Sequence, residues 1–103
     1  MALTHFVFSA VGEQSSGGLV PAMIGDTIQS EGIAPTGSNQ QTTGIAPLLG
    51  RKVGLRVATD TAVYVAVGEN PNATTAAARV YIPANTVEYI MCNAGDKAAV
   101  VTA

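Results

Sequence analysis

The stretch KVGLRVATDTAVYVAVG, residues 52–68, decides the fold class of this chain. Apolar residues fall at positions 53, 55 and 57 and again at 63, 65 and 67, a spacing that places them on one face of a β-strand. The intervening Thr59-Asp60-Thr61 is short enough for a hairpin connection. The stretch therefore predicts two strands, residues 52–58 and 62–67, joined as a hairpin.

The pattern continues on both sides of this stretch. Further strands are expected at residues 2–11, 79–82, 86–92 and 97–102. The segments that separate the later strands are GENPN at 68–72, PAN at 83–85 and NAGD at 93–96. Their residue types suit tight reversals, and Gly95 is expected to take a positive φ.

Strands at this spacing indicate an all-β fold, a small antiparallel β-sandwich or a jelly-roll-like barrel. The segment TTAAAR, residues 74–79, is the one rival, because alanine favours a helical turn. Its two β-branched threonines and its brevity predict an extended or loop state instead. We expect a single domain over residues 1–103, with a strand and extended arm or loops in residues 1–50 and regular antiparallel strands in residues 51–103.

The first half of the chain is expected to form an extended arm. Pro21 limits LVPAMIGDT, residues 19–27, to an edge strand or an arm. Residues 29–44 are polar and predict a long loop without regular structure, a kind that is commonly functional or ordered by a partner. The tetrapeptide GIAP occurs at both 32–35 and 44–47, by chance or as a true repeat. The candidate interface residues of this arm are Ile33, Pro35, Ile45, Pro47 and Leu48.

The apolar residues are mostly small, which limits the core. Hydrophobic residues make up 48% of the 103 positions and charged residues 12%, but alanine and valine supply much of the apolar fraction. At about 25 cal/mol per Å² of buried apolar area, small side chains yield little stabilisation per residue. A partner surface would add burial, so we expect a homo-oligomer, a dimer or a trimer.

Charge argues against nucleic acid as a partner. The formal net charge is −2, and the five basic residues are spread over the second half without a dense cluster. No apolar run approaches the ~20 residues that span a bilayer, so no membrane partner is expected. The first residues lack the basic region of a secretory signal, which predicts synthesis and retention in a cytoplasm.

Residue types that carry chemistry are sparse. His5 is the only histidine, so a histidine-centred metal site or a Ser-His-Asp triad would have to be built around the first expected strand. Cys92 is the only cysteine and is expected to be a small buried hydrophobe at a strand end. The seven acidic residues and the glycines form no recognisable acid–base or phosphate-binding motif. We therefore expect no catalytic residue, no metal and no cofactor, and a protein that is not an enzyme.

Three tyrosines complete the set of candidate interface residues. Tyr64, Tyr81 and Tyr89 all lie in expected strands, and on an outward face they could form a subunit interface or a carbohydrate platform. The alternative is that they pack in or at the rim of the sandwich. Arg56 lies between two inward positions, so its side chain should point away from the core.

Three segments of the second half resemble small virion proteins of tailed bacteriophages. They are AVYVAVGENPNATT at 62–75, YIPANTVEY at 81–89 and GDKAAV at 95–100. The corresponding pattern is a strand ending in VAVG-x-NP-x-AT, an LPAN-T-x-EY hairpin and a final strand PGDKVAVI. The sequence departs from it at Ile82, where the pattern has leucine, and at Asn93-Ala94, where a proline often precedes the glycine. The likeness covers about the last forty residues, and the first half shows none.

The resemblance implies a β-sandwich accessory protein of a phage particle, a capsid decoration or cement protein. Its partner would be the major capsid protein, its place the capsid surface of the virion, and its site of synthesis the host cytoplasm. The alternative is a head-fibre or tail-associated module that contacts host glycans through exposed tyrosines. An enzyme is the least favoured class.

Overall fold

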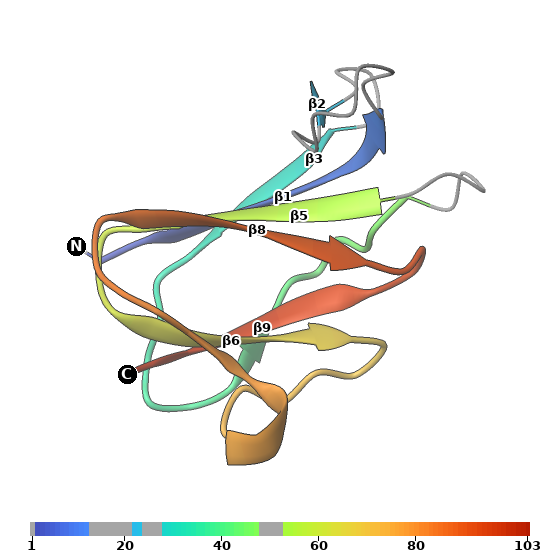
Figure 1. Ribbon diagram of the computed structural model, residues 1–103. Helices are drawn as coiled ribbons and strands as arrows, with labels where there is room; N and C mark the ends of the chain where they lie inside the picture. The colour runs from blue at the N-terminus through green and yellow to red at the C-terminus, as the bar shows by residue number, and fades with distance from the viewer. Residues whose placement is uncertain (1, 13–21, 24–27, 48–52) are drawn as a thin grey trace.

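Two antiparallel sheets face each other in the computed structural model, which describes residues 2–12, 22–23, 28–47 and 53–103 (Figure 1). The first sheet contains β1 (Thr4–Gly12), β2 (Ala22–Met23), β3 (Gln29–Ile33), β5 (Val53–Thr59) and β8 (Thr86–Cys92). The second contains β4 (Gln40–Gln41), β6 (Val63–Gly68), β7 (Val80–Ile82) and β9 (Lys97–Thr102). The predicted small antiparallel β-sandwich is thereby confirmed.

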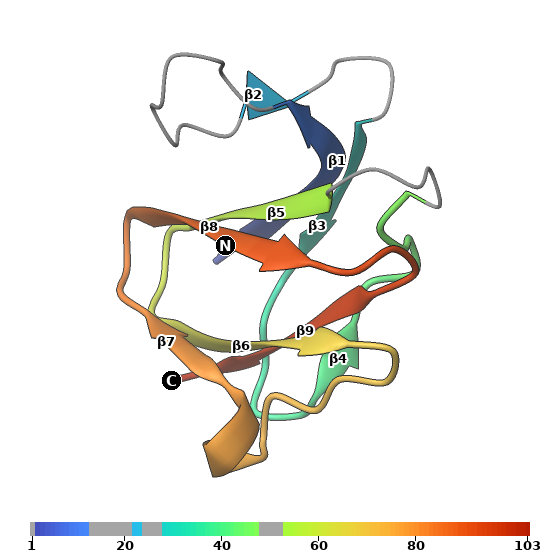
Figure 2. The same ribbon diagram turned by 45° about the vertical axis from the view of Figure 1, so that its right-hand side comes forward.

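Each sheet has a defined strand order. In the first sheet, β1 pairs with β5 along one edge and with β3 and β2 along the other, and β5 pairs in turn with β8. The order in the second sheet is β4-β9-β6-β7, as Figure 2 shows in the lower layer. Strands β3 and β8 therefore border the first sheet, and β4 and β7 border the second.

The core lies between the two sheets and is built by alternation along the strands. Every second residue of β5 is buried, as are Val63 and Val65 of β6, which confirms the alternation seen in the sequence. Phe6 and Phe8 of β1 supply the aromatic side chains of this core. The main cluster contains Phe6, Phe8, Ile33, Ala46, Val53, Leu55, Val57, Val63, Val65, Ile82, Ala98 and Val100.

The predicted hairpin between residues 52–58 and 62–67 is wrong, because β5 and β6 lie in different sheets. Both edges of β5 are already paired over its whole length, by β1 and by β8. The chain therefore leaves the sheet after Thr59. The Thr61 N–H donates to the Thr59 hydroxyl oxygen at 3.3 Å, and that hydroxyl donates to the Thr61 carbonyl at 2.7 Å, which closes the turn that crosses to the second sheet.

The segments 83–85 and 93–96 also join the two sheets. The first connects β7 to β8 and the second connects β8 to β9. Asn85 has a φ of 57° and Gly95 a φ of 87°, so each turn uses a residue type that tolerates the left-handed region. The positive φ expected at Gly95 is confirmed.

The loop predicted over residues 29–44 contains two strands, so the expectation of no regular structure is wrong there. Strand β3 pairs with β1 over five residues, and β4 pairs with β9. Backbone hydrogen bonds make these pairings, and they do not require apolar side chains. Ile33 and Thr42 are buried, which makes this segment part of the sandwich. Pro21 lies outside the described residues, and of the stretch around it only β2 is described.

The outer face of the second sheet is covered by the segment of residues 69–79. Its Ala73 packs on Ala66, Ala99 and Val101, and these four residues form a second buried cluster. The side chain of Asn39 binds this segment twice, donating to the Pro71 carbonyl at 3.2 Å and accepting from the Ala73 N–H at 2.8 Å. Small side chains let the segment lie close to the sheet. The alanine content noted in the sequence therefore serves a second packing layer.

Residues 76–78 form one turn of 3-10 helix, which corrects the prediction of an extended or loop state for residues 74–79. A separate turn precedes it at Asn72, whose side-chain oxygen accepts hydrogen bonds from the Thr74 N–H at 3.0 Å and from the Thr74 hydroxyl at 2.6 Å. The Thr75 N–H then donates to the Asn72 carbonyl. The Ala78 N–H donates to the Thr75 carbonyl at 3.1 Å and closes the 3-10 turn, whose N-cap residue Thr75 makes no side-chain capping bond.

Replacing Phe6 tests the contribution of the inner face. Phe6 is fully buried, so Phe6→Ala should lower the free energy of unfolding by about 3–5 kcal/mol through lost burial and a residual cavity. Phe6→Leu keeps most of the volume and should cost less than about 1.5 kcal/mol. Urea unfolding followed by circular dichroism measures both, and equal losses for the two variants would contradict this role.

Glu31 ties β3 to the following segment in a pH-dependent way. Its carboxylate accepts hydrogen bonds from the Thr43 N–H at 3.0 Å and the Gly44 N–H at 3.1 Å. Burial opposes ionisation, but the hydrogen bonds from Thr43 and Gly44 outweigh it and lower the pKa of Glu31. A lowered pKa in the folded state means that ionised Glu31 stabilises the fold above its unfolded pKa, and that this stability is lost as the pH falls through the folded pKa.

The Glu31→Gln variant should therefore be less stable than the parent protein at pH 7, by about 1 kcal/mol for a partly exposed site. The difference should shrink as the pH falls below the ordinary glutamate pKa of about 4.3 and then through the lower pKa of folded Glu31, where the parent carboxylate becomes protonated. Urea unfolding at pH 7 and in this acidic range measures it. Glu69→Gln, at an exposed glutamate in a turn, is the control and should leave stability unchanged.

Candidate functional site

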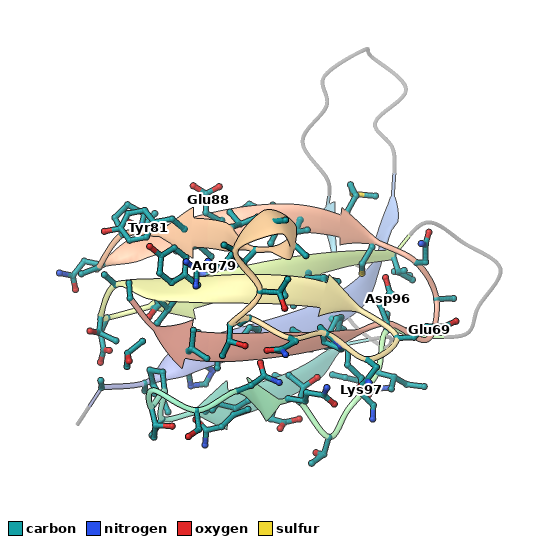
Figure 3. The ribbon with its side chains drawn as sticks, turned by 90° about the horizontal axis from the view of Figure 1, so that it is seen from below. Glu69, Arg79, Tyr81, Glu88, Asp96 and Lys97 are labelled. Atoms are coloured by element: carbon teal, nitrogen blue, oxygen red, sulfur yellow. The ribbon has the colours of Figure 1, made fainter. Side chains whose placement is uncertain are left out.

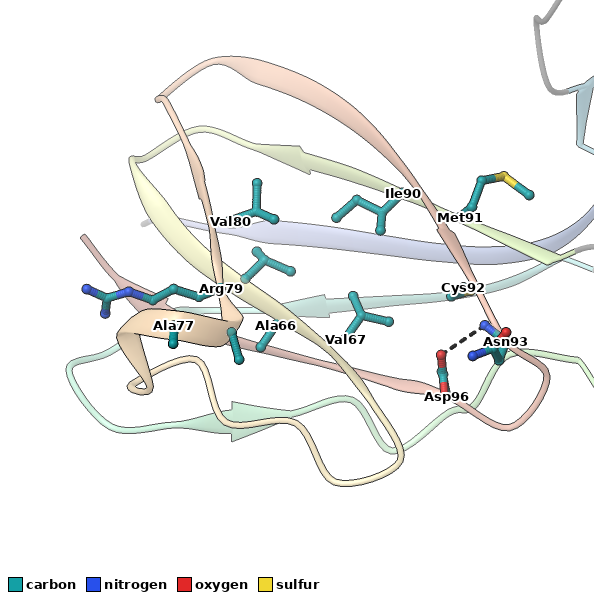
Figure 4. A pocket seen from close by; sticks show the side chains of 12 residues that line it. Ala66, Val67, Ala77, Arg79, Val80, Ile90, Met91, Cys92, Asn93 and Asp96 are labelled. Atoms are coloured by element: carbon teal, nitrogen blue, oxygen red, sulfur yellow. Dashed lines mark hydrogen bonds between the residues drawn. The ribbon is translucent and has the colours of Figure 1, made fainter.

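An open edge of the sandwich lies between β7 and β8. Strand β7 pairs over three residues with β6, and β8 pairs with β5; within the described residues neither has a strand on its other side. A cavity of about 540 Å³ lies between these two borders. Figure 4 shows Val67, Val80 and Ile90 among the apolar side chains that line it, with Cys92 and Asp96 at one end.

The polar groups of the cavity are held by their own neighbours. Asp96 is buried, and its carboxylate accepts a hydrogen bond from the Asn93 N–H at 2.9 Å. Burial, with a smaller contribution from the Asp96 charge, raises the pKa of Cys92 to about 11. The thiol therefore remains protonated at neutral pH, the state in which cysteine is a poor nucleophile. Cys92 lies at the end of β8 and packs against the main core as expected, but it is only partly buried and not buried as the sequence predicted.

Tyr64, Tyr81 and Arg79 form a cluster on the second sheet, here called the tyrosine cluster. Tyr64 and Tyr81 are cross-strand partners on β6 and β7, and their ring centroids lie 5.6 Å apart with the planes tilted by 59°. The Arg79 guanidinium carbon lies 3.6 Å from the centre of the Tyr64 ring, a cation–π contact. Figure 3 shows Arg79 and Tyr81 side by side at the border of the molecule.

The tyrosine cluster is both ordered and accessible. A guanidinium N–H of Arg79 donates to the Ala73 carbonyl at 3.4 Å, which helps to hold the guanidinium over the Tyr64 ring. Tyr64 is partly buried and packs against the second buried cluster, whereas 53% of Tyr81 is exposed. The arrangement presents an aromatic ring and a positive charge that are fixed before any partner arrives.

The outer face of β8 carries a second exposed apolar surface. The exposed fractions are 43% for Val87, 56% for Tyr89 and 56% for Met91, all on the same side of the strand. Arg56 lies directly beside Tyr89 on β5. It is partly buried on the face away from the core, as the alternation predicted. This surface is separate from the tyrosine cluster because it belongs to the first sheet.

The structure places the predicted interface residues in different environments. Ile33 and Pro47 are buried, and Ile33 belongs to the main core. Pro35 and Ile45 are partly buried, and Leu48 lies outside the described residues. Tyr64 and Tyr81 are brought together, whereas Tyr89 lies on the other sheet. Ile33 ends β3, at the border of the first sheet opposite to β8.

Sequence reasoning missed Arg79, Val87 and Met91 as surface candidates. The period of two in residues 87, 89 and 91 was available as a signal, because it puts Val87 and Met91 on the same face as Tyr89. The position of Arg79 over Tyr64 had no such signal, since it depends on the path of the covering segment.

Metal-binding residue types do not gather in the described part of the chain. No group of three or more His, Cys, Asp or Glu side chains there could hold a metal ion. Among the same residues, no helix has the length and apolar character needed to cross a membrane.

Comparison with known proteins gives no relative for this chain. No protein-family model, no curated protein and no solved structure matches it.

The raised pKa of Cys92 predicts slow alkylation. With a pKa of about 11, roughly one thiol in a thousand is ionised at pH 8, against about one in four for an unperturbed thiol. Labelling of the folded protein with iodoacetamide should therefore be at least about tenfold slower than labelling in urea. Thr102→Cys in a Cys92→Ser background supplies an exposed control thiol, and equal rates for the two thiols would contradict the raised pKa.

Proposed function

We propose that this chain is a structural protein of a phage particle, a capsid decoration or cement protein that binds the outside of the head and stabilises the shell. The sequence resemblance suggests the class, and the tyrosine cluster is the observation that carries the proposal. The partner is the major capsid protein, and the chain is made in the host cytoplasm before it joins the virion. No reaction is part of this role.

The composition of the tyrosine cluster suits a protein partner. Tyrosine and arginine are among the residues that most often dominate the binding energy of protein interfaces. The contacts of Arg79 with Tyr64 and with the Ala73 carbonyl hold its side chain in place. Fewer rotamers are then lost on binding, which lowers the entropic cost of association. Tyr81, with 53% of its surface exposed, is the group available to enter a pocket on the shell.

Shell stabilisation follows from binding alone. A protein that binds the assembled shell, and not its dissociated subunits, shifts the equilibrium toward assembly by mass action. Because a shell repeats the same site many times, a modest affinity per site is multiplied over the particle. The sandwich presents the tyrosine cluster to the shell from a packed fold, whose core lies between the inner strands β1 and β5 of one sheet and β9 and β6 of the other.

Glycan binding is the second candidate function. It is favoured by the exposed rings of Tyr81 and Tyr89, because flat aromatic faces suit the apolar faces of sugars. In that case the chain would belong to a head fibre or tail and would contact host polysaccharide. The two tyrosines lie on different sheets, so a single sugar platform would use one of them.

The Tyr81→Ala variant tests the proposed capsid contact. Purified protein mixed with expanded empty heads of the phage that encodes it should bind at a fixed copy number and raise the temperature of head disruption. Tyr81→Ala should weaken binding by at least about tenfold, as expected for a central tyrosine in an interface. Ile28→Ala removes a comparably exposed apolar side chain just before β3, at the opposite border, and should bind like the parent protein.

Mass spectrometry of purified mature particles provides the independent check. The proposal is overturned if the chain is absent from them, or if Tyr81→Ala binds heads with unchanged affinity. Binding to host polysaccharide that is lost in Tyr81→Ala, without binding to heads, would support the glycan-binding role instead.

A further inference from the structure

The four borders of the two sheets are protected to different degrees. A border strand exposes backbone N–H and C=O groups that can pair with another chain, and soluble proteins usually blunt it. Two borders are protected because their strands are short. Strand β4 has two residues and β7 has three. The β3 border carries the charge of Glu31, whose carboxylate binds the Thr43 and Gly44 backbone and holds that segment against the strand.

Strand β8 is less protected, because Glu88 is its one charge and, within the described residues, no strand pairs with its free edge. It runs for seven residues, TVEYIMC, and contains neither proline nor lysine. The pairing with β5 covers all seven without a break in register, so the strand carries no bulge along its length. Its outer face exposes Val87, Tyr89 and Met91. A long, regular and apolar border strand of this kind is suited to pairing with a further strand.

We propose that the partner of this border is a second copy of the chain, with β8 pairing antiparallel to β8 across a two-fold axis at Tyr89. The two five-stranded sheets would then form one continuous sheet of twice the width. Such an isologous contact uses the same surface on both copies, so it closes as a dimer. The inference goes beyond the proposed function and does not depend on it.

The register of this pairing follows from the sequence of β8. Tyr89 is the middle residue of Thr86–Cys92, so all seven residues overlap when Tyr89 of one copy faces Tyr89 of the other. Val87 of either copy then lies opposite Met91 of the other copy on the outer face. These side chains and the two Tyr89 side chains form a continuous apolar row across the dimer interface. A slip of one residue would turn the apolar face of one copy to the opposite side.

Charge selects the same register. Glu88 is the only charged residue of β8, and in the Tyr89-centred register it faces Ile90 of the second copy. A slip of two residues in one direction would place the two Glu88 side chains directly opposite each other, which is unfavourable. A slip of two residues in the other direction would also shorten the overlap. In the proposed register the two Glu88 side chains lie on a diagonal, so their repulsion is weaker and is screened by salt.

Sedimentation equilibrium across the micromolar range tests the dimer. The parent protein should be dimeric, and Tyr89→Lys should weaken the dimer at least about tenfold because two positive charges would meet at the axis. Tyr81→Lys is the matched control, since Tyr81 has a similar exposed fraction on β7, and it should remain dimeric. Glu88→Gln should strengthen the dimer by removing the diagonal repulsion.

Disulfide trapping tests the register without relying on a destabilising variant. In a Cys92→Ser background, Tyr89→Cys should form an intermolecular disulfide on mild oxidation, because directly facing Cβ atoms lie about 5 Å apart. Val87→Cys alone should not, but a mixture of the Val87→Cys and Met91→Cys proteins should. These variants change exposed side chains, and circular dichroism verifies that each is folded.

Three outcomes would overturn the inference. One is a parent protein that stays monomeric over the whole concentration range. Another is a dimer that Tyr81→Lys disrupts and Tyr89→Lys leaves intact, which would place the contact on β7. The last is efficient trapping by Val87→Cys alone, which would show a different register. None of these results bears on whether the chain binds phage heads, so the two proposals fail separately.

Discussion

The pairing of β5 along both of its edges is the constraint on which the rest of the sandwich depends. Its seven residues form complete registers with β1 and with β8, and its inner face supplies Val53, Leu55 and Val57 to the core. With no free edge on β5, the chain after Thr59 has to cross to the second layer. The position of β8 at a border of the first sheet follows from the same pairing, and with it the exposure of its outer face.

The strands of the second half were predictable from the sequence because they alternate and are separated by turn residues. Residues 86–92 and 97–102 coincide with β8 and β9, and the other predicted bounds in this half differ by at most one residue. The partners of the strands were not predictable, because the shortness of the 59–61 turn suits a hairpin and a crossing equally well. Strand β3 was missed because its pairing with β1 is made by backbone groups, which leave no apolar pattern in the side chains.

The surfaces were predictable only in part. The tyrosines could be found from their residue type and their place in strands, but the contact between Tyr64 and Tyr81 depends on the β6–β7 register. The residues of the expected arm illustrate the opposite case. Ile33 appears in a polar segment, yet it is buried because β3 brings it to the end of the core. Periodicity assigns a residue to a face of its own strand, and it does not say what covers that face.

The alanine layer under residues 69–79 has a consequence for motion. Short side chains such as Ala66, Ala73 and Ala99 give up little free energy when they separate. The side chains of Asn39 and Gln41 supply the hydrogen bonds that join the segment to β4 and the residue before it. Local opening of this segment should therefore require less free energy than global unfolding. Arg79 lies at the end of this segment, so a small adjustment of the segment to an uneven partner would leave the inner core undisturbed.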